Sequence, residues 1–153
     1  MKWRFIPALA FSFFFFTAVT GSAFAQQEFA PAPIPSAIRS AKTAFISNAS
    51  GQSIMPPGTS DLAYNEFYAA IKTWGRYQLV GSPADADLIL EIRFLRADGG
   101  DFEFRATVFE KKTHTILWAF SQSVPQSANT TKSRQLFDQA MRTLVDHLEQ
   151  LAA

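Results

Sequence analysis

Apolar and polar side chains alternate through most of the segment from Asp87 to Phe120, and this two-residue period restricts the fold more than any other feature. Three runs show it, at 88–94, 102–108 and 116–120, each with its main apolar side chains at even-numbered positions. Because successive strand residues point to opposite faces of a sheet, the pattern predicts three half-buried strands. Short polar segments separate the runs, which favours an antiparallel meander with Ile116, Trp118 and Phe120 on its buried face.

The charges of the first two runs predict how these strands pair. Paired residue numbers that sum to either 196 or 198 keep the even-numbered positions buried. The sum of 196 sets Glu91 opposite Arg105 and Arg93 opposite Glu103, whereas 198 sets the two arginines opposite each other. Because opposite charges across strands contribute about 0.2–1 kcal/mol and like charges destabilise, we expect the 196 register, with a loop around residues 96–100.

Two helices and two further strands complete the predicted fold. The apolar residues of 62–74 and 133–151 recur at helical spacing, and Gly75 lies where a left-handed helix stop is needed. Short strands are expected at 43–46 and 77–80. The order β-α-β-β-β-β-α predicts an α+β two-layer sandwich, with a mixed sheet of about five strands and two helices packed on one face.

The N-terminal residues have the three parts of a secretory signal peptide. Lys2 and Arg4 give a basic start, residues 5–19 are apolar or small, and Ala23 and Ala25 are the small residues at a cleavage site. The alternative is a retained membrane anchor. Fifteen helical residues rise only about 22 Å, short of a hydrocarbon core of about 30 Å, so we expect cleavage after Ala25 and no stable membrane insertion afterwards.

Composition divides the rest of the chain into a tether and one domain. Residues 26–40 are rich in proline and alanine, and we expect them to form a tether to a single α+β domain at 41–153. The chain has 14 basic and 13 acidic residues, so loss of Lys2 and Arg4 leaves 12 and 13, a charge of −1. This balance offers no footprint for nucleic acid, and the absence of cysteine excludes a lipid anchor on a cleavage-site cysteine.

The sequence contains no pattern typical of catalysis or of metal and cofactor binding. Its two histidines, His114 and His147, are far apart, and a zinc site needs three or four ligands. Asp85 and Asp87 are two residues apart without the spacing of a calcium loop. We therefore expect a non-enzyme with no cofactor. The alternative is a small hydrolase or ligand-binding protein that uses the long loop at 48–60 with these two aspartates.

One face of the predicted sheet is less polar than a solvent-facing surface normally is. Ile89, Leu95, Phe109 and Leu117 lie at odd-numbered positions among the charged residues, and together they form a candidate interface. With the signal peptide, this feature indicates an exported envelope module, periplasmic or extracellular, that binds a protein or another envelope component.

Four segments of the chain resemble a group of exported bacterial proteins of the kind frequent in acidobacteria. They are Ala41–Asn48, Tyr64–Tyr68, Trp74–Tyr77 and Ala86–Ile92. More distantly, the rhythm of strand, helix, G-x-Y-x-x-V and A-D-L-x-L is similar to the N-terminal domain of the Tol–Pal propeller protein. The resemblance implies a bacterial envelope protein with an adaptor-like, non-catalytic fold, and it transfers no functional residues.

Overall fold

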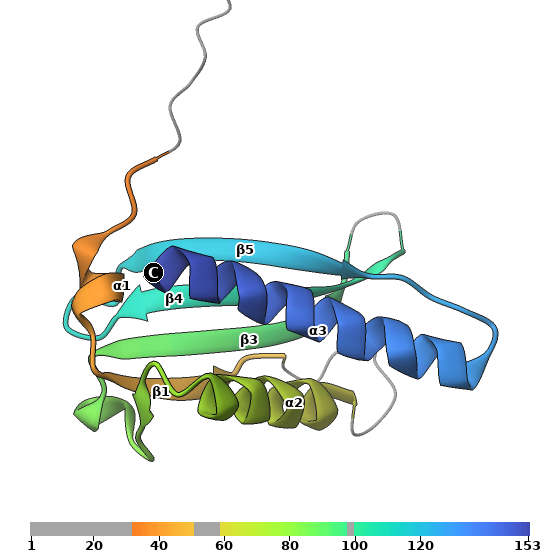
Figure 1. Cartoon of the computed structure of the whole chain (residues 1–153), viewed down its shortest axis with the longest axis horizontal. Coiled ribbons are helices and arrows are strands. Elements are labelled where there is room, and N and C mark those ends of the chain that lie inside the picture. The colour runs from red at the N-terminus through yellow and green to blue at the C-terminus, as the bar shows by residue number, and fades with distance from the viewer. Residues whose placement is uncertain (1–31, 51–58, 98–99) are drawn as a thin grey trace, which may run out of the picture. The chain divides into compact units, whose positions relative to one another are not determined.

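The computed structural model describes residues 32–50, 59–97 and 100–153 (Figure 1). All helices and strands among these residues lie in one compact unit, Pro33–Ala153. The elements in chain order are α1 (Ser36–Ser40), β1 (Thr43–Asn48), α2 (Thr59–Trp74), β2 (Gln78–Leu79), the short 3-10 helix η1 (Pro83–Asp85), β3 (Leu88–Arg96), β4 (Phe102–Glu110), β5 (Ile116–Val124) and α3 (Thr130–Ala152). The signal peptide expected at 1–25, with its cleavage residues Ala23 and Ala25, lies outside the described residues and stays a prediction.

The strands form one mixed sheet in the order β2-β1-β3-β4-β5. The strand β1 pairs in parallel with both β2 and β3, because α2 carries the chain back across the sheet before the next strand. The pairs β3–β4 and β4–β5 are antiparallel, as tight connections require. The five-stranded sheet and its meander therefore confirm the predicted fold class.

The helices α2 and α3 cover one face of this sheet (Figure 1). The core between the two layers includes Phe67 and Ile71 of α2, Leu144 and Leu148 of α3, and the inward residues of the strands. Four phenylalanines form its aromatic centre. Phe137 of α3 meets the rings of Phe94 and Phe104 edge-on, and Phe102 stacks on Phe94. This arrangement is the predicted two-layer sandwich.

The segment just before β1 belongs to the folded unit. Residues 36–40, which were expected to be part of the tether, form α1, and the side chain of Ile38 is fully buried in the core. The hydroxyl of Tyr77 donates a hydrogen bond of 2.9 Å to the Ile38 carbonyl oxygen. Burial raises the pKa of the Tyr77 phenol, and the nearby Arg76 charge opposes this increase.

Replacing Tyr77 by phenylalanine is expected to lower the free energy of unfolding by about 1–3 kcal/mol, because the Ile38 carbonyl loses its donor while it stays buried. Urea unfolding of Tyr77→Phe measures this change. Tyr68→Phe is the matched control, since its ring is 37% exposed and water can replace a lost hydroxyl partner there. Equal destabilisation by the two substitutions would contradict an anchoring role for the Tyr77 hydroxyl.

The predicted register of β3 against β4 is wrong. The structure pairs Arg93 with Arg105 and Leu95 with Glu103, so that the paired numbers sum to 198. Each arginine instead meets the glutamate two residues before it on its own strand. The distance from Arg93 Nε to Glu91 Oε1 is 2.9 Å, and the distance from an Arg105 guanidinium nitrogen to Glu103 Oε1 is 2.5 Å. The favourable charge contacts therefore form within strands, where the register does not affect them.

The connection between β3 and β4 explains why the 198 register forms. The Ala97 N–H donates to the Asp101 carbonyl at 2.7 Å, and the Gly100 N–H donates to the Ala97 carbonyl at 3.1 Å. Gly100 has a φ of +95°, a conformation that glycine adopts without strain and a regular strand does not contain. A sum of 196 would place Gly100 inside the ladder, opposite Arg96. Turn geometry therefore outweighs exposed charge pairs, which are worth about 0–1 kcal/mol each.

Helix ends follow the chemistry of their capping residues. Gly75 has a φ of +68°, as a left-handed stop after α2 requires, and its N–H donates to the Ile71 carbonyl. The side chain of Asn129 accepts a hydrogen bond of 3.0 Å from the Lys132 N–H and starts α3 three residues before the predicted position.

Candidate functional site

The face of the sheet opposite α2 and α3 carries a row of four apolar side chains. Direct strand pairing sets Phe45 beside Ile89, Ile89 beside Phe109, and Phe109 beside Ile116. We call these four residues the outer row. Neighbouring strands lie about 4.8 Å apart, so the row is continuous across β1, β3, β4 and β5. Its first three side chains are half-buried, whereas Ile116 is 58% exposed.

A β-bulge places Ile116 on this face. Val108 pairs with Trp118 and Phe109 pairs with Ile116, so Leu117 is the additional residue on β5. The expectation that Ile116 shares the buried face with Trp118 and Phe120 is therefore wrong, because the bulge breaks the two-residue alternation between positions 116 and 118. Trp118 and Phe120 pack against the core as expected.

The predicted interface residues divide into two groups. Ile89 and Phe109 are direct neighbours in the outer row. Leu95 lies opposite Glu103 near the far end of β3, and Leu117 packs against the core at the bulge, so neither belongs to the row. Sequence reasoning missed Phe45 and Ile116. The alternation of Phe45 with buried Ala44 and Ile46 was the available signal for the first of these, whereas nothing in the sequence indicated the bulge.

The outer face also presents two arginines close together. Arg93 and Arg105 are paired across β3 and β4, and each side chain is 49% exposed. Their glutamate partners, Glu91 and Glu103, are only 19% and 15% exposed. The guanidinium groups are therefore the more accessible charges of this face. Like charges directly opposite each other across strands are unfavourable, and a carboxylate placed over both would relieve that repulsion.

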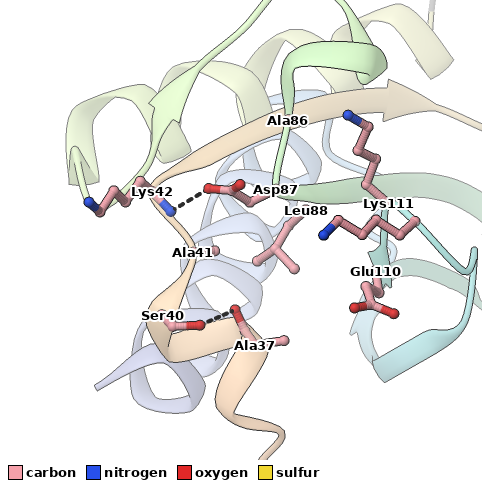
Figure 2. Close-up of a pocket in the computed structure, with 10 residues that line it drawn as sticks. Ala37, Ser40, Ala41, Lys42, Ala86, Asp87, Leu88, Glu110 and Lys111 are labelled. Carbon is pink, nitrogen blue, oxygen red and sulfur yellow. Dashed lines mark hydrogen bonds between the residues drawn. The ribbon is translucent and has the colours of Figure 1, made fainter.

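A cavity of about 440 Å³ lies at the start of β1, between α1 and the start of β3 (Figure 2). Its central carboxylate is Asp87, which accepts hydrogen bonds from the backbone N–H groups of Lys42 at 2.8 Å and Thr43 at 3.0 Å. Figure 2 shows the Lys42 side chain extending away from Asp87. The Lys111 ammonium donates to the Ala84 carbonyl oxygen. The Asp87 contacts connect the residue before β3 to the start of β1, and the Lys111 contact connects the β4–β5 turn to η1.

The hydrogen bonds to Asp87 set its protonation. The Lys42 N–H, followed by the Thr43 N–H, holds the pKa of the Asp87 carboxyl below its usual value, and the Thr43 hydroxyl and the Lys42 charge act in the same direction. A carboxylate stabilised in its ionised form is unsuited to be a general acid. Asp87 therefore makes a structural contact and is not suited to donate a proton.

Asp87 should make stability depend on pH in the acid range. Because its pKa is lower in the folded state, the ionised carboxylate stabilises the fold above the unfolded pKa of about 4. This contribution is lost as the pH falls through the folded pKa. We expect Asp87→Asn to be less stable than the parent at pH 7, and the two to converge as the pH falls towards 2. Urea unfolding at several pH values measures this, and Asp85→Asn is the control for a nearby exposed carboxylate. Parallel pH profiles of parent and Asp87→Asn would contradict the assignment.

The described residues of the alternative hydrolase site are not brought together. The described start of the 48–60 loop lies at the end of β1, where Asn48 pairs with Ile92 and the Ser50 hydroxyl accepts a hydrogen bond from the Phe94 N–H. Asp87 lies beside Thr43 at the start of β1. These positions are separated by the length of the strand, about 15–20 Å for six residues. Residues 51–58 lie outside the described residues.

The histidines also occupy separate places. His114 lies in the turn between β4 and β5 with a φ of +52°, and the ring of His147 on α3 meets Phe120 edge-on at a centroid distance of 6.3 Å. Within 32–50, 59–97 and 100–153, no group of three or more histidine, aspartate or glutamate side chains could hold a metal ion. Among the same residues, no helix has the length and apolar character that crossing a membrane requires.

Comparison with known proteins shows a shared fold. No family model matches this chain, and no curated protein matches it. Among solved structures, a homologue of the neuraminyllactose-binding hemagglutinin from Helicobacter pylori is 9% identical over 75% of this chain and 87% of its own, with a TM-score of 0.51. A PelC variant from Paraburkholderia phytofirmans, described as a dodecamer, is 13% identical over 69% and 86%, with a TM-score of 0.50. At these identities the likeness establishes the fold alone.

These matches correct the resemblance inferred from the sequence. The solved structures that match with a TM-score of 0.50 or more include PelC and the hemagglutinin homologue, and they do not support the similarity to the Tol–Pal propeller protein. No family model or curated protein supports the relation to exported acidobacterial proteins. The short motifs that suggested both relations are strand and helix signals that many α+β domains share.

Proposed function

We propose that this chain is a non-enzymatic module of the bacterial cell envelope that binds a protein through the outer row and the adjacent Arg93 and Arg105. The envelope location is proposed from the signal peptide expected at residues 1–25. The two bacterial structures that share the fold carry names that indicate binding and assembly, a hemagglutinin homologue and a dodecamer, which accords with this role.

The continuity of the outer row is the observation that carries the proposal. A sheet with one face on the core normally presents polar side chains on its other face. Here four apolar side chains stand side by side on that face, and the last of them, Ile116, is the most exposed large hydrophobic among the described residues. Scattered apolar residues need no explanation, but a contiguous group on one surface marks an interface.

The charges beside the row specify the partner's chemistry. A partner segment with apolar side chains can cover Phe45, Ile89, Phe109 and Ile116. A carboxylate four residues further along β3 and β4, about 13 Å away, can reach both Arg93 and Arg105. Bidentate contacts between arginine and carboxylate are among the stronger polar contacts at interfaces. The partner is therefore a protein segment that combines apolar and acidic side chains. The alternative hydrolase is not proposed, because the described start of its loop and Asp87 lie at opposite ends of β1.

Photo-crosslinking in the native host tests this function. A photoreactive phenylalanine analogue at position 116 is expected to yield one dominant crosslinked protein, and the same analogue at Tyr68, the other exposed large hydrophobic, is expected to yield little. The double substitution Arg93→Gln and Arg105→Gln should reduce the crosslink from position 116 at least fivefold, because the partner's carboxylate loses both contacts.

The matched control is Arg142→Gln, which removes an exposed arginine from α3 and should leave the crosslink unchanged. Circular dichroism of each variant confirms that the fold is intact. Equal crosslinking from positions 116 and 68, or a crosslink that is insensitive to loss of both arginines, would refute the proposed binding role.

A further inference from the structure

The strand β5 forms an edge of the sheet without the usual protection against further pairing. It has nine residues, whereas β2 at the opposite edge has only two. Protein edges are commonly protected by charged side chains, proline or short length. No residue of Ile116–Val124 is charged or proline, and the next proline is at position 125, just after the strand. The bulge at Leu117 affects only the start of the strand, so residues 118–124 keep regular pairing geometry.

The flank of α3 next to this edge is also uncharged. A shallow cavity of about 240 Å³ lies between β5 and α3, and Gln122, Leu136, Gln139 and Thr143 are among its lining residues. One helical turn further on, the ring of His147 packs on Phe120 of β5. We call the edge of β5 and this flank of α3 the β5–α3 side.

Between Leu136 and Gln150, the charged residues of α3 lie on its other flank. Asp138, Arg142, Asp146 and Glu149 line a separate cavity that α3 shares with Glu66 and Thr73 of α2. The helix therefore separates its charges from the side that continues the strand edge. Depletion of charge over an accessible strand and the helix beside it is a property of interface cores.

We propose that the β5–α3 side binds the same side of a second copy of this chain, with the two β5 strands antiparallel about a two-fold axis. A two-fold axis brings the same patch of both copies together, so the strand edge meets a strand edge and the helix flank meets a helix flank. A second copy presents a strand edge and an uncharged helix flank at matching heights, whereas an isolated peptide strand would cover the edge alone. Because neither surface carries charge, the copies meet without like-charge repulsion. This surface meets the outer row only at the start of β5, where Ile116 lies on the outer face.

The geometry of this pairing places both outer rows on one surface. A two-fold axis through an antiparallel strand pair is perpendicular to the sheet, so the helices of both copies lie on the same side. The sheet then continues from one copy to the other, and the outer face of each copy stays accessible. Self-association at β5 therefore leaves the proposed protein-binding surface open.

Sedimentation velocity of the purified full chain tests the pairing. We expect the parent to sediment at twice the chain mass at micromolar concentration. Ser121→Lys on β5 and Thr143→Lys on α3 should each weaken the dimer at least tenfold, because each places two lysines near the axis. Gln135→Lys is the control, since residue 135 lies on the solvent-facing side of α3 and should leave the dimer intact.

Opposite charges provide a second, independent readout. Thr143→Lys and Thr143→Glu should each be monomeric alone and should form a mixed dimer when combined at equal concentration. A parent that stays monomeric, a dimer insensitive to Ser121→Lys and Thr143→Lys, or the absence of mixed dimers would overturn the proposal. Failure of the proposed protein-binding function is read separately, from the mass of the product crosslinked at Ile116, because a second copy of this chain gives twice the chain mass and a different protein does not.

Discussion

Replacing Phe104 by alanine is expected to lower the free energy of unfolding by about 3–5 kcal/mol. The side chain is fully buried on β4, and its ring meets Phe94 at a centroid distance of 5.0 Å and Phe137 at 4.8 Å. Alanine would leave a cavity at the point where the sheet meets α3, and Phe94 and Phe137 would each lose one ring contact. Because small domains are stable by only about 5–15 kcal/mol, this single change removes a large part of the total. Urea unfolding followed by circular dichroism measures it.

Phe109 on the same strand provides the matched control. It is half-buried on the outer face, where Phe109→Ala removes similar apolar volume without opening a cavity between the layers. We expect it to cost less than half as much as Phe104→Ala. Equal costs would mean that the outer face is as tightly packed as the core, which contradicts an accessible outer row.

Replacing Ile38 by alanine is expected to cost about 2–4 kcal/mol, although this residue lies in a segment whose composition resembles a tether. Its side chain is fully buried, and α1 packs against α3 near the C-terminal end of that helix. The loss should therefore resemble that of a core position. The measurement is the urea midpoint, with an unchanged m-value showing that the folded unit still unfolds in one transition.

Ile116→Ala is the control for the same chemical change at an exposed site. With 58% of its surface accessible, Ile116 contributes little to folding, and we expect a change of about 0.5 kcal/mol or less. If Ile38→Ala were equally mild, α1 would be a peripheral addition and the folded unit would begin at β1. The two isoleucines therefore measure where the folded unit begins.

Periodicity predicted the fold because burial on a two-layer sandwich repeats locally. The even-numbered residues from Leu88 to Phe94 on β3 and from Phe104 to Val108 on β4 are buried as the alternation required. The helix stripes and the stop at Gly75 were readable for the same reason, since each depends on neighbours within a few residues. The boundary between tether and domain was harder to place, because a five-residue helix leaves no periodic signal and Ile38 becomes a core residue only through contacts with distant elements.

Two predictions failed where the outcome depended on how strands meet. Charge favoured Arg93 opposite Glu103, but the conformation of Gly100 in the connecting loop decided the register. Alternation favoured a buried Ile116, but the bulge at Leu117 moved it to the outer face. Both features arise from pairing between strands. The alternative pairings differ in free energy by about 1 kcal/mol, which is too small for composition alone to resolve.

Hydrophobic spacing along the chain was sufficient to predict the α+β class, the order of the strands and of the two long helices, and the buried face of β3 and β4. The pairing of the strands and the packing of α3 were needed to show that Phe45, Ile89, Phe109 and Ile116 form one row, and that an uncharged strand edge continues into an uncharged helix flank. The physical reason is that a surface is assembled from residues far apart in the chain. Its continuity depends on register, bulges and helix rotation, which side-chain spacing within a single segment does not encode.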